Sequence, residues 1–116
     1  MREIKFRGRE QDGFWTYGDL RHEGNITGII ENGIYSWVDS STVGQYTGLR
    51  DVDGRRMYEG DIVRIDDWSS PSYIRWDDDT ASFVVDRWAV NLAHVCYRKV
   101  IGNIHDNPEL LEAKDA

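Results

Sequence analysis

The sequence predicts a mainly β fold of the β-rich α+β class: a small bent sheet or SH3-like, partly open barrel of short antiparallel strands, with a short C-terminal helix. Three observations support this class. Short apolar runs alternate with turn sequences rich in Gly and Asp along most of the chain. Asn32-Gly33 and Asp53-Gly54 are typical of two-residue hairpin loops. Five tryptophans and six tyrosines among 116 residues add strand propensity.

The N-terminal part predicts two strands followed by a hairpin. Ile4 and Phe6 alternate with charged residues, so the first strand has one apolar and one charged face. A second strand over residues 14–17 follows the turn signal "DG". The dipeptide "NG" between "ITGIIE" and "IYSWV" predicts a type I′ turn, which needs positive φ at both central positions.

The C-terminal part predicts further strands and the helix. The strands cover residues 62–65, 73–76, 82–86 and 95–104, and the second and third form a hairpin across "DDDT". Gly102 marks a bulge or a close backbone approach in the last strand. In "DNPELLEAKDA", a capping Asn or Asp, a Pro in the first turn and two leucines predict a helix over about residues 107–114. Residues 86–94 are compatible with one further turn of helix.

Length and composition predict one domain over residues 1–116, with residues 1–40 as a candidate N-terminal subregion. The net charge is −7, which disfavours nucleic-acid binding because such proteins present a basic face. The charge is uneven, however: residues 1–10 carry four basic and two acidic side chains, whereas residues 51–79 carry four basic and nine acidic ones. This asymmetry allows a small basic patch or an acidic surface for a basic partner.

The N-terminus lacks the apolar core of a signal peptide, and no apolar run approaches the length that crosses a bilayer. These features predict a cytoplasmic protein without a membrane partner. The single cysteine, Cys96, excludes an intrachain disulfide and a cysteine-based zinc site.

The central stretch "TVGQYTGLRDVDGRRMYEGDIV", residues 42–63, allows two interpretations. Its glycines and aspartates are either corners between short strands or part of a loop-built binding surface. A calcium loop starting at Asp51 is excluded, because Arg55 and Ile62 would occupy ligand positions that need oxygen donors. No phosphate-binding glycine motif occurs. For the binding surface, the candidate contacts in this stretch are Tyr46, Arg50, Arg55, Arg56 and Tyr58.

Three other groups of residues suggest chemistry. Asp66-Asp67 and the run 77–79 would hold a hard cation such as magnesium if the two segments paired. His94 and Cys96 would share one face of a strand, as a base and a nucleophile do, although a free cysteine more often fills a core. Aromatic side chains near basic ones are suited to stack on single-stranded bases, namely Phe14, Trp15 and Tyr17 with Arg7, Arg9 and Arg21.

Four blocks, "MREIKFRGR", "GFWTYGDL", the central stretch and "VIGNIHDNPELLE", resemble the YopX family of small phage and prophage proteins, in the same order. Residues 21–41 and 63–99 depart from that resemblance. The resemblance implies a phage or prophage origin, the bacterial host cytoplasm, and a β-rich domain that assembles into homo-oligomers. The resemblance implies no enzymatic activity, and it assigns no catalytic residues to this sequence.

These observations lead to the hypothesis of a non-enzymatic phage accessory protein, a homo-oligomeric module that binds a host or phage protein. Neither a cofactor nor a metal ligand set nor a catalytic residue is predicted. One alternative is a nucleic-acid-binding phage regulator, and another is a metal-dependent enzyme that uses the acidic loops. The expected contacts are the aromatic and arginine residues typical of interfaces, here Trp15, Tyr17, Tyr46, Arg50, Arg56 and Tyr58.

Overall fold

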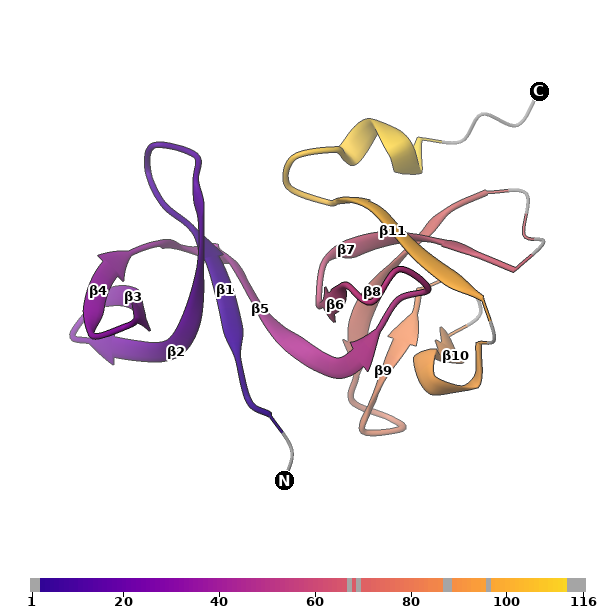
Figure 1. The fold of residues 1–116 in the computed structure, drawn as a ribbon, viewed down its shortest axis with the longest axis horizontal. Coiled ribbons are helices and arrows are strands. Elements are labelled where there is room, and N and C mark those ends of the chain that lie inside the picture. The colour runs from indigo at the N-terminus through magenta and orange to yellow at the C-terminus, as the bar shows by residue number, and fades with distance from the viewer. Residues whose placement is uncertain (1–2, 67, 69, 87–88, 96, 113–116) are drawn as a thin grey trace. The chain divides into compact units, whose positions relative to one another are not determined.

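The computed structural model describes residues 3–66, 68, 70–86, 89–95 and 97–112, shown in Figure 1. Its regular structure consists of antiparallel strands in two sheets, which confirms the predicted β-rich class. The chain divides into two compact units, an N-terminal unit over Met1–Gly48 and a C-terminal unit over Leu49–Ala116. The N-terminal unit extends past the candidate subregion 1–40. That both units fold as one domain stays a prediction.

The N-terminal unit is an antiparallel sheet of five strands: β1 (Phe6–Arg9), β2 (Trp15–Glu23), β3 (Ile26–Glu31), β4 (Ile34–Trp37) and the part of β5 (Asp39–Arg50) that precedes Leu49. Neighbours in the order β4-β3-β2-β1-β5 pair antiparallel. Only Val38 separates β4 from β5, although these strands stand at opposite ends of that order. The sheet therefore curves until its two ends are joined by one residue, as the bent-sheet prediction requires.

Close backbone approaches make this curvature possible. A Cβ atom on Gly8 would lie 2.7 Å from the Val38 Cγ2 atom, so the corner between β4 and β5 packs directly on β1. A Cβ atom on Gly18 would lie 2.0 Å from the carbonyl oxygen of Ile30. Glycine is the residue that allows two backbones to come this close.

The hairpin predicted at Asn32-Gly33 is confirmed. It joins β3 to β4, and both of its residues have positive φ, 52° and 81°. Asparagine and glycine tolerate this conformation, and the type I′ turn matches the twist of the flanking strands.

The C-terminal unit contains a second sheet in the order β10-β9-β8-β7-β11. Its strands are β7 (Asp61–Ile65), β8 (Ser72–Asp77), β9 (Ser82–Val85), β10 (Val90–Asn91) and β11 (Arg98–Asn103). A short strand, β6 (Arg56–Tyr58), hydrogen-bonds to β5 instead. The pairing of β11 with β7 shifts register between Val100 and Gly102, so of the two features expected at Gly102, a bulge or a close backbone approach, the structure has a bulge-type irregularity.

An aliphatic core holds the C-terminal unit together. Seven of its buried side chains form one cluster, each at most 5% exposed: Met57, Val63, Ile65, Ile74, Val85, Leu92 and Val95. Val63 and Ile65 are two residues apart on β7 and therefore share a sheet face, and Ile74 of β8 pairs directly with Val85 of β9. Burial of such side chains is the main favourable term in folding.

The predicted C-terminal helix is wrong in its length and type. Residues 108–111 form a 3-10 turn after Asn107, and Glu112 is already extended. The Asn107 side chain does not cap this turn; its Oδ1 atom accepts a hydrogen bond from the Asn103 backbone N–H at 3.2 Å. Because the Asn107 side chain bonds to β11 instead of capping the turn, the segment does not continue as an α-helix through residue 112. Residues 113–116 of the prediction lie outside the described residues.

The sequence of residues 86–94 is compatible with one turn of helix. The structure has a 3-10 turn there, over Leu92–His94, after the short strand β10. The Asn91 side chain accepts a hydrogen bond from the Ala93 N–H at 2.9 Å and caps the turn. Leu92 is fully buried in the core cluster, so this turn closes one side of the C-terminal unit.

Candidate functional site

The hairpin of β1 and β2 places two arginines and two aromatic residues on one sheet face. Arg9 pairs with Trp15 and Arg7 with Tyr17, and side chains two residues apart on a strand share a face. The Arg7 Cζ atom lies 4.8 Å from the centre of the Trp15 ring, and the Arg9 Cζ atom lies 5.9 Å from it. Both guanidinium groups are within the range of cation–π attraction, so the Trp15 ring is already engaged inside the hairpin.

Beside this hairpin, the N-terminal unit contains a pocket of about 610 Å³. Two segments line it, the β1–β2 turn at residues 9–13 and the β4–β5 corner at residues 37–39. The β1–β2 turn is held in shape by backbone hydrogen bonds from Gly13 N to Glu10 O, 2.9 Å, and from Glu10 N to Phe14 O, 2.8 Å. The corner is held against β3 by a bond from Val38 N to Thr27 O, 3.0 Å. Backbone hydrogen bonds therefore fix both walls of the pocket.

The pocket is rich in carboxylates. Glu10, Asp12 and Asp39 line it together with one cation, Arg9. Asp12 Oδ1 accepts a bond from Phe14 N at 3.1 Å, and Asp39 Oδ1 accepts bonds from Ser41 N at 3.0 Å and Ser41 Oγ at 2.8 Å. The Glu10 carboxylate accepts a bond from the hydroxyl of Thr16. Local hydrogen bonds thus orient all three acidic groups.

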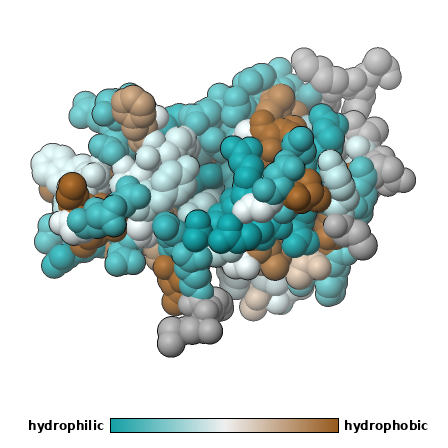
Figure 2. Space-filling model, viewed as in Figure 1, coloured by the Kyte–Doolittle hydropathy of each residue, from teal (hydrophilic) through white to brown (hydrophobic). Residues whose placement is uncertain are grey.

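Large apolar side chains stand at the surface of the N-terminal unit. Phe14 is 72% exposed, Ile34 68% and Trp37 67%. Figure 2 shows brown, apolar side chains at the surface in the region drawn as β1–β4 in Figure 1. Trp37 also lines the pocket, and Phe14 directly follows the turn that forms its other wall. An aromatic surface therefore adjoins an acidic pocket.

In the central stretch, Asp51 ties a turn to a neighbouring strand. Its Oδ1 atom accepts bonds from the backbone N–H groups of Asp53 and Arg55, both at 2.9 Å, and its Oδ2 atom accepts one from Val100 at 3.0 Å. Burial acts to raise the pKa of Asp51, but these three N–H donors and the charge of Arg55 outweigh it and lower the pKa. Gly54 adopts a φ of 83° in the same turn. The interpretation of this stretch as structural corners is supported here.

The second corner of the central stretch lies at Gly60 and Asp61. Gly60, with a φ of 90°, donates its N–H to Ile74 O at 2.9 Å and accepts a bond from Ile104 N at 2.8 Å. The Asp61 carboxylate is buried, and its Oδ2 atom accepts a bond from Tyr58 N at 2.8 Å. Gly60 therefore links β8 to the residue that follows β11, and the Asp61 carboxylate fixes the turn before β7.

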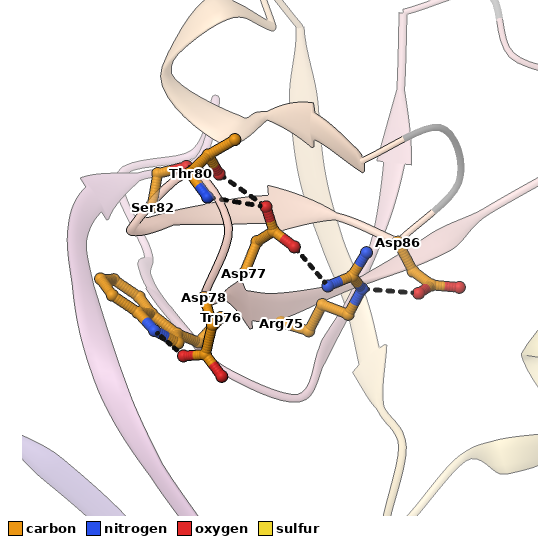
Figure 3. Close-up of polar contacts among 7 residues, drawn as sticks. All are labelled: Arg75, Trp76, Asp77, Asp78, Thr80, Ser82 and Asp86. Carbon is orange, nitrogen blue, oxygen red and sulfur yellow. Dashed lines mark hydrogen bonds and ion pairs between the residues drawn. The ribbon is translucent and has the colours of Figure 1, made fainter.

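The acidic hairpin of β8 and β9 forms its own polar network, drawn in Figure 3. Arg75 lies between two carboxylates, with Nε 2.7 Å from Asp86 Oδ1 and Nη1 3.3 Å from Asp77 Oδ1. Asp77 also accepts bonds from the Thr80 hydroxyl, 2.7 Å, and the Thr80 N–H, 3.2 Å. Hydrogen bonding to Thr80 is the largest cause that lowers the pKa of Asp77, and Arg75 lowers it further. The Trp76 indole donates to Asp78 at 2.8 Å.

The proposed metal site in the acidic loops gains no support from this geometry. Within the described residues, no group of three or more His, Cys, Asp or Glu side chains is placed to hold a metal ion. Asp66 instead accepts a hydrogen bond from Tyr97 N at 2.6 Å. Asp67 lies outside the described residues, as does Cys96 of the proposed His94–Cys96 pair.

The six expected contact residues fall in both units. Trp15, Tyr17 and Tyr46 belong to the N-terminal unit, and the other three belong to the C-terminal unit. Tyr46 is 6% exposed, and in the C-terminal unit Tyr58 is 4% exposed, which favours a structural role for these two side chains. The two arginines among these contacts differ in exposure. Arg56 is half-buried, whereas Arg50 is exposed and its Nη1 atom donates a hydrogen bond to Gly54 O at 2.8 Å. Their role as contacts stays a prediction.

Sequence reasoning missed the pocket because its two walls are distant along the chain. In the sequence, Trp37 is only the fourth residue of a predicted hairpin strand, and Asp39 belongs to the segment after that strand. A weak signal was present: in "SWVDSST", an aromatic residue and an acidic residue flank a valine where a second hairpin strand should end. Nothing local indicated that this valine forms a corner against Gly8.

The protein-family model described as YopX protein matches residues 2–112, nearly the whole chain. This chain belongs to the YopX family. The resemblance carried by the four sequence blocks is therefore confirmed. A comparison with curated proteins found no match.

Among solved structures, this YopX chain is similar to the crystal structure of protein EF1440 from Enterococcus faecalis. The TM-score is 0.65 at 21% sequence identity, and the match covers 97% of this chain and 100% of the other. At this identity, the likeness supports the fold alone. No helix in the described part of the chain is long and apolar enough to cross a membrane.

Proposed function

We propose that this YopX protein is a non-enzymatic accessory protein of phage or prophage type that acts in the bacterial host cytoplasm. It self-associates and binds a host or phage protein, and the N-terminal unit supplies the contact surface. Trp15 and Tyr17 stay among the proposed contacts of this surface, and the exposed aromatic residues beside the pocket are added to them. Arg50 and Arg56 stay predicted contacts of the C-terminal unit.

One observation carries this proposal. Among the described residues of the N-terminal unit, two large hydrophobic side chains are buried and five are exposed. The buried ones are Ile29 and Tyr46, and the exposed ones are Ile4, Phe14, Ile26, Ile34 and Trp37. Single exposed apolar residues are normal, but a unit that exposes more of them than it buries is typical of a surface that a partner covers. Aromatic side chains are also the usual energetic centres of protein interfaces.

The first experiment tests self-association. A variant with Phe14→Ser, Ile34→Ser and Trp37→Ser is compared with the unaltered chain by gel filtration with light scattering. We expect the unaltered chain to elute as an oligomer and the triple variant to shift toward the monomer. A control with Val52→Ser and Trp76→Ser, exposed positions of the C-terminal unit, should keep the oligomer. A monomeric unaltered chain at micromolar concentration would remove the homo-oligomer from the proposal.

The second experiment tests the protein partner. A photo-crosslinking amino acid replaces Phe14 in one variant and Trp76 in another, and both are irradiated in host cells during phage growth. We expect a discrete crosslinked protein, identified by mass spectrometry, from position 14 and not from position 76. Equal crosslinking from both positions would contradict a partner surface on the N-terminal unit.

A nucleic-acid-binding role is the second candidate, because Arg7, Arg9, Trp15 and Tyr17 share one sheet face. The stacking of both guanidinium groups on Trp15 weighs against it, since bases need an accessible aromatic face. This role predicts binding of a single-stranded oligonucleotide that weakens steeply as salt rises. A fluorescence-polarisation titration at low salt without any binding would remove it.

A further inference from the structure

The pocket beside the β1–β2 turn has two kinds of wall that suit a cationic side chain. The first is the indole of Trp37, which lines the pocket while 67% of the residue is exposed. The second is a set of carboxylates, Glu10, Asp12 and Asp39, on both sides of the opening. Tryptophan is the strongest aromatic partner for a cation, and a carboxylate within reach adds an ion pair.

The charge of the pocket favours a cation over an anion. Three carboxylates line it against one guanidinium, that of Arg9. The Arg9 guanidinium also lies over the Trp15 ring, 5.9 Å from its centre, so its charge is partly directed into the hairpin. Phosphate groups would meet repulsion here, whereas a Lys or Arg side chain would meet complementary charge.

The apolar surroundings indicate that the cation is part of a polypeptide. Phe14 is 72% exposed and follows the turn that forms one wall of the pocket, while the other wall contains the exposed Trp37. A free amine or small cation would leave Phe14 uncovered. A protein segment with an apolar residue next to its basic residue would cover Phe14 and fill the pocket together.

We propose that the pocket formed by residues 9–13 and 37–39 binds a Lys or Arg side chain of a partner protein segment, with Trp37 against the cation and Asp12 and Asp39 as its ion-pair acceptors. The proposal rests on the proposed protein-binding function and names the chemistry of the partner. The neighbouring apolar residue of that segment packs on Phe14.

The test is a titration of the full-length, ¹⁵N-labelled chain with three acetylated and amidated hexapeptides, GLKRLG, GLQQLG and GLEELG. They differ only in the central pair, so charge is separated from apolar contact. We expect GLKRLG to shift the amide signals of residues 9–13 and 37–39 and the indole signal of Trp37. Its affinity should exceed that of GLQQLG by about threefold to tenfold, as expected for one cation–π contact and exposed ion pairs. GLEELG should bind most weakly.

Two variants assign the contacts. Trp37→Ala removes the aromatic wall, and Asp12→Asn removes one charge while its Oδ1 atom can still accept the bond from Phe14 N. Each should weaken GLKRLG binding by about threefold or more. Trp76→Ala, an exposed tryptophan of the C-terminal unit, should leave it unchanged. The amide spectrum away from the pocket shows whether each variant remains folded.

Several results would overturn the proposal. Equal shifts of the spectrum with all three peptides would do so, and so would pocket signals that no peptide shifts. Pocket signals that move with protein concentration but do not respond to GLKRLG would make a second copy of the chain the occupant. Pocket signals that move with a single-stranded oligonucleotide would replace the peptide by nucleic acid. If position 14 still crosslinks a partner while the pocket ignores basic peptides, the protein-binding function stands and this inference fails.

Discussion

The two units of this chain use their apolar residues in opposite ways. The C-terminal unit buries ten large hydrophobic side chains among its described residues and exposes three. The N-terminal unit buries two and exposes five, and its other buried side chains are polar, for example Thr16, Thr27 and Thr42. Both are antiparallel sheets, so the strand architecture alone does not decide where apolar surface goes.

The difference indicates how each unit is stabilised. Aliphatic packing dominates in the C-terminal unit, where burial removes apolar area from water. In the N-terminal unit, backbone pairing, glycine-mediated close approach and polar bonds take a larger share; Thr42, for instance, accepts a bond from Arg9 N at 2.9 Å. A unit that needs few of its apolar residues for a core can present them to a partner.

The largest expected effect is on the aliphatic core. Ile74→Ala removes a side chain that is 1% exposed and packed in the core cluster, so we expect a loss of about 2–5 kcal/mol in the free energy of unfolding. Ile34→Ala, at an exposed position of the N-terminal unit, should change it by no more than about 0.5 kcal/mol. Urea denaturation monitored by circular dichroism measures both. Equal losses at the two positions would contradict the contrast between the units.

The next effect tests the close approaches in the N-terminal unit. Gly18→Ala places a Cβ atom 2.0 Å from the Ile30 carbonyl oxygen, so the backbone must shift, at a cost of about 1–3 kcal/mol. Gly24→Asn is the control, because Gly24 has a φ of 61° in open space and asparagine tolerates that conformation. Amide signals followed through a urea titration report each unit separately. Signals of both units that disappear at one urea concentration would support the predicted single domain, and an unchanged midpoint in Gly18→Ala would contradict the close approach.

A smaller effect is expected at the turn that Asp51 holds. Asp51→Asn takes away the charge that three backbone N–H groups share, and we expect a loss of about 1–2 kcal/mol at neutral pH. The exposed neighbour Asp53 provides the matched variant, Asp53→Asn, which should have little effect. Urea denaturation of both variants compares them, and similar losses would contradict the structural role of Asp51.

The same residue predicts a pH dependence. The pKa of Asp51 is lowered from its ordinary value of 3.8 in the folded chain, so its carboxylate stabilises the fold fully above pH of about 4. This contribution is lost as the pH falls through the lowered pKa. The stability difference between the unaltered chain and Asp51→Asn should therefore shrink between pH 7 and pH 2. A difference that grows on acidification would contradict the assignment.

The smallest effect is expected at the β8–β9 hairpin. Arg75 pairs with Asp86 and Asp77 at the surface, where solvent and salt weaken ion pairs. Arg75→Gln should destabilise the chain less than Ile74→Ala, Gly18→Ala or Asp51→Asn, and the loss should fade in high salt. Arg64→Gln, at an exposed arginine of the same sheet, is the control. Thermal denaturation at low and high salt measures both, and a salt-independent loss would contradict a surface ion pair.

Local sequence patterns predicted the strands and turns well. The short apolar run at residues 62–65 and the dipeptide "NG" act within a few residues, and the structure has β7 and the β3–β4 hairpin there. The C-terminal helix was overestimated because its pattern of cap, proline and leucines is local, while Asn107 bonds to Asn103 of β11. The roles of the acidic residues were harder still to predict. Asp51 ties its turn to β11 because the backbone N–H of Val100, distant in sequence, donates a hydrogen bond to its carboxylate.

The sequence by itself determined the β-rich class, the positions of the corners and membership of the YopX family, since these depend on residue types and spacings along the chain. Only the tertiary structure decided which aspartates support turns, which tyrosines are buried, and that the β1–β2 turn and Trp37 line one pocket. The physical reason is that burial and pocket walls depend on which distant strands come together. Strand pairing in the curved sheet brings Arg9 next to Asp39, and no pattern of a few residues contains that information.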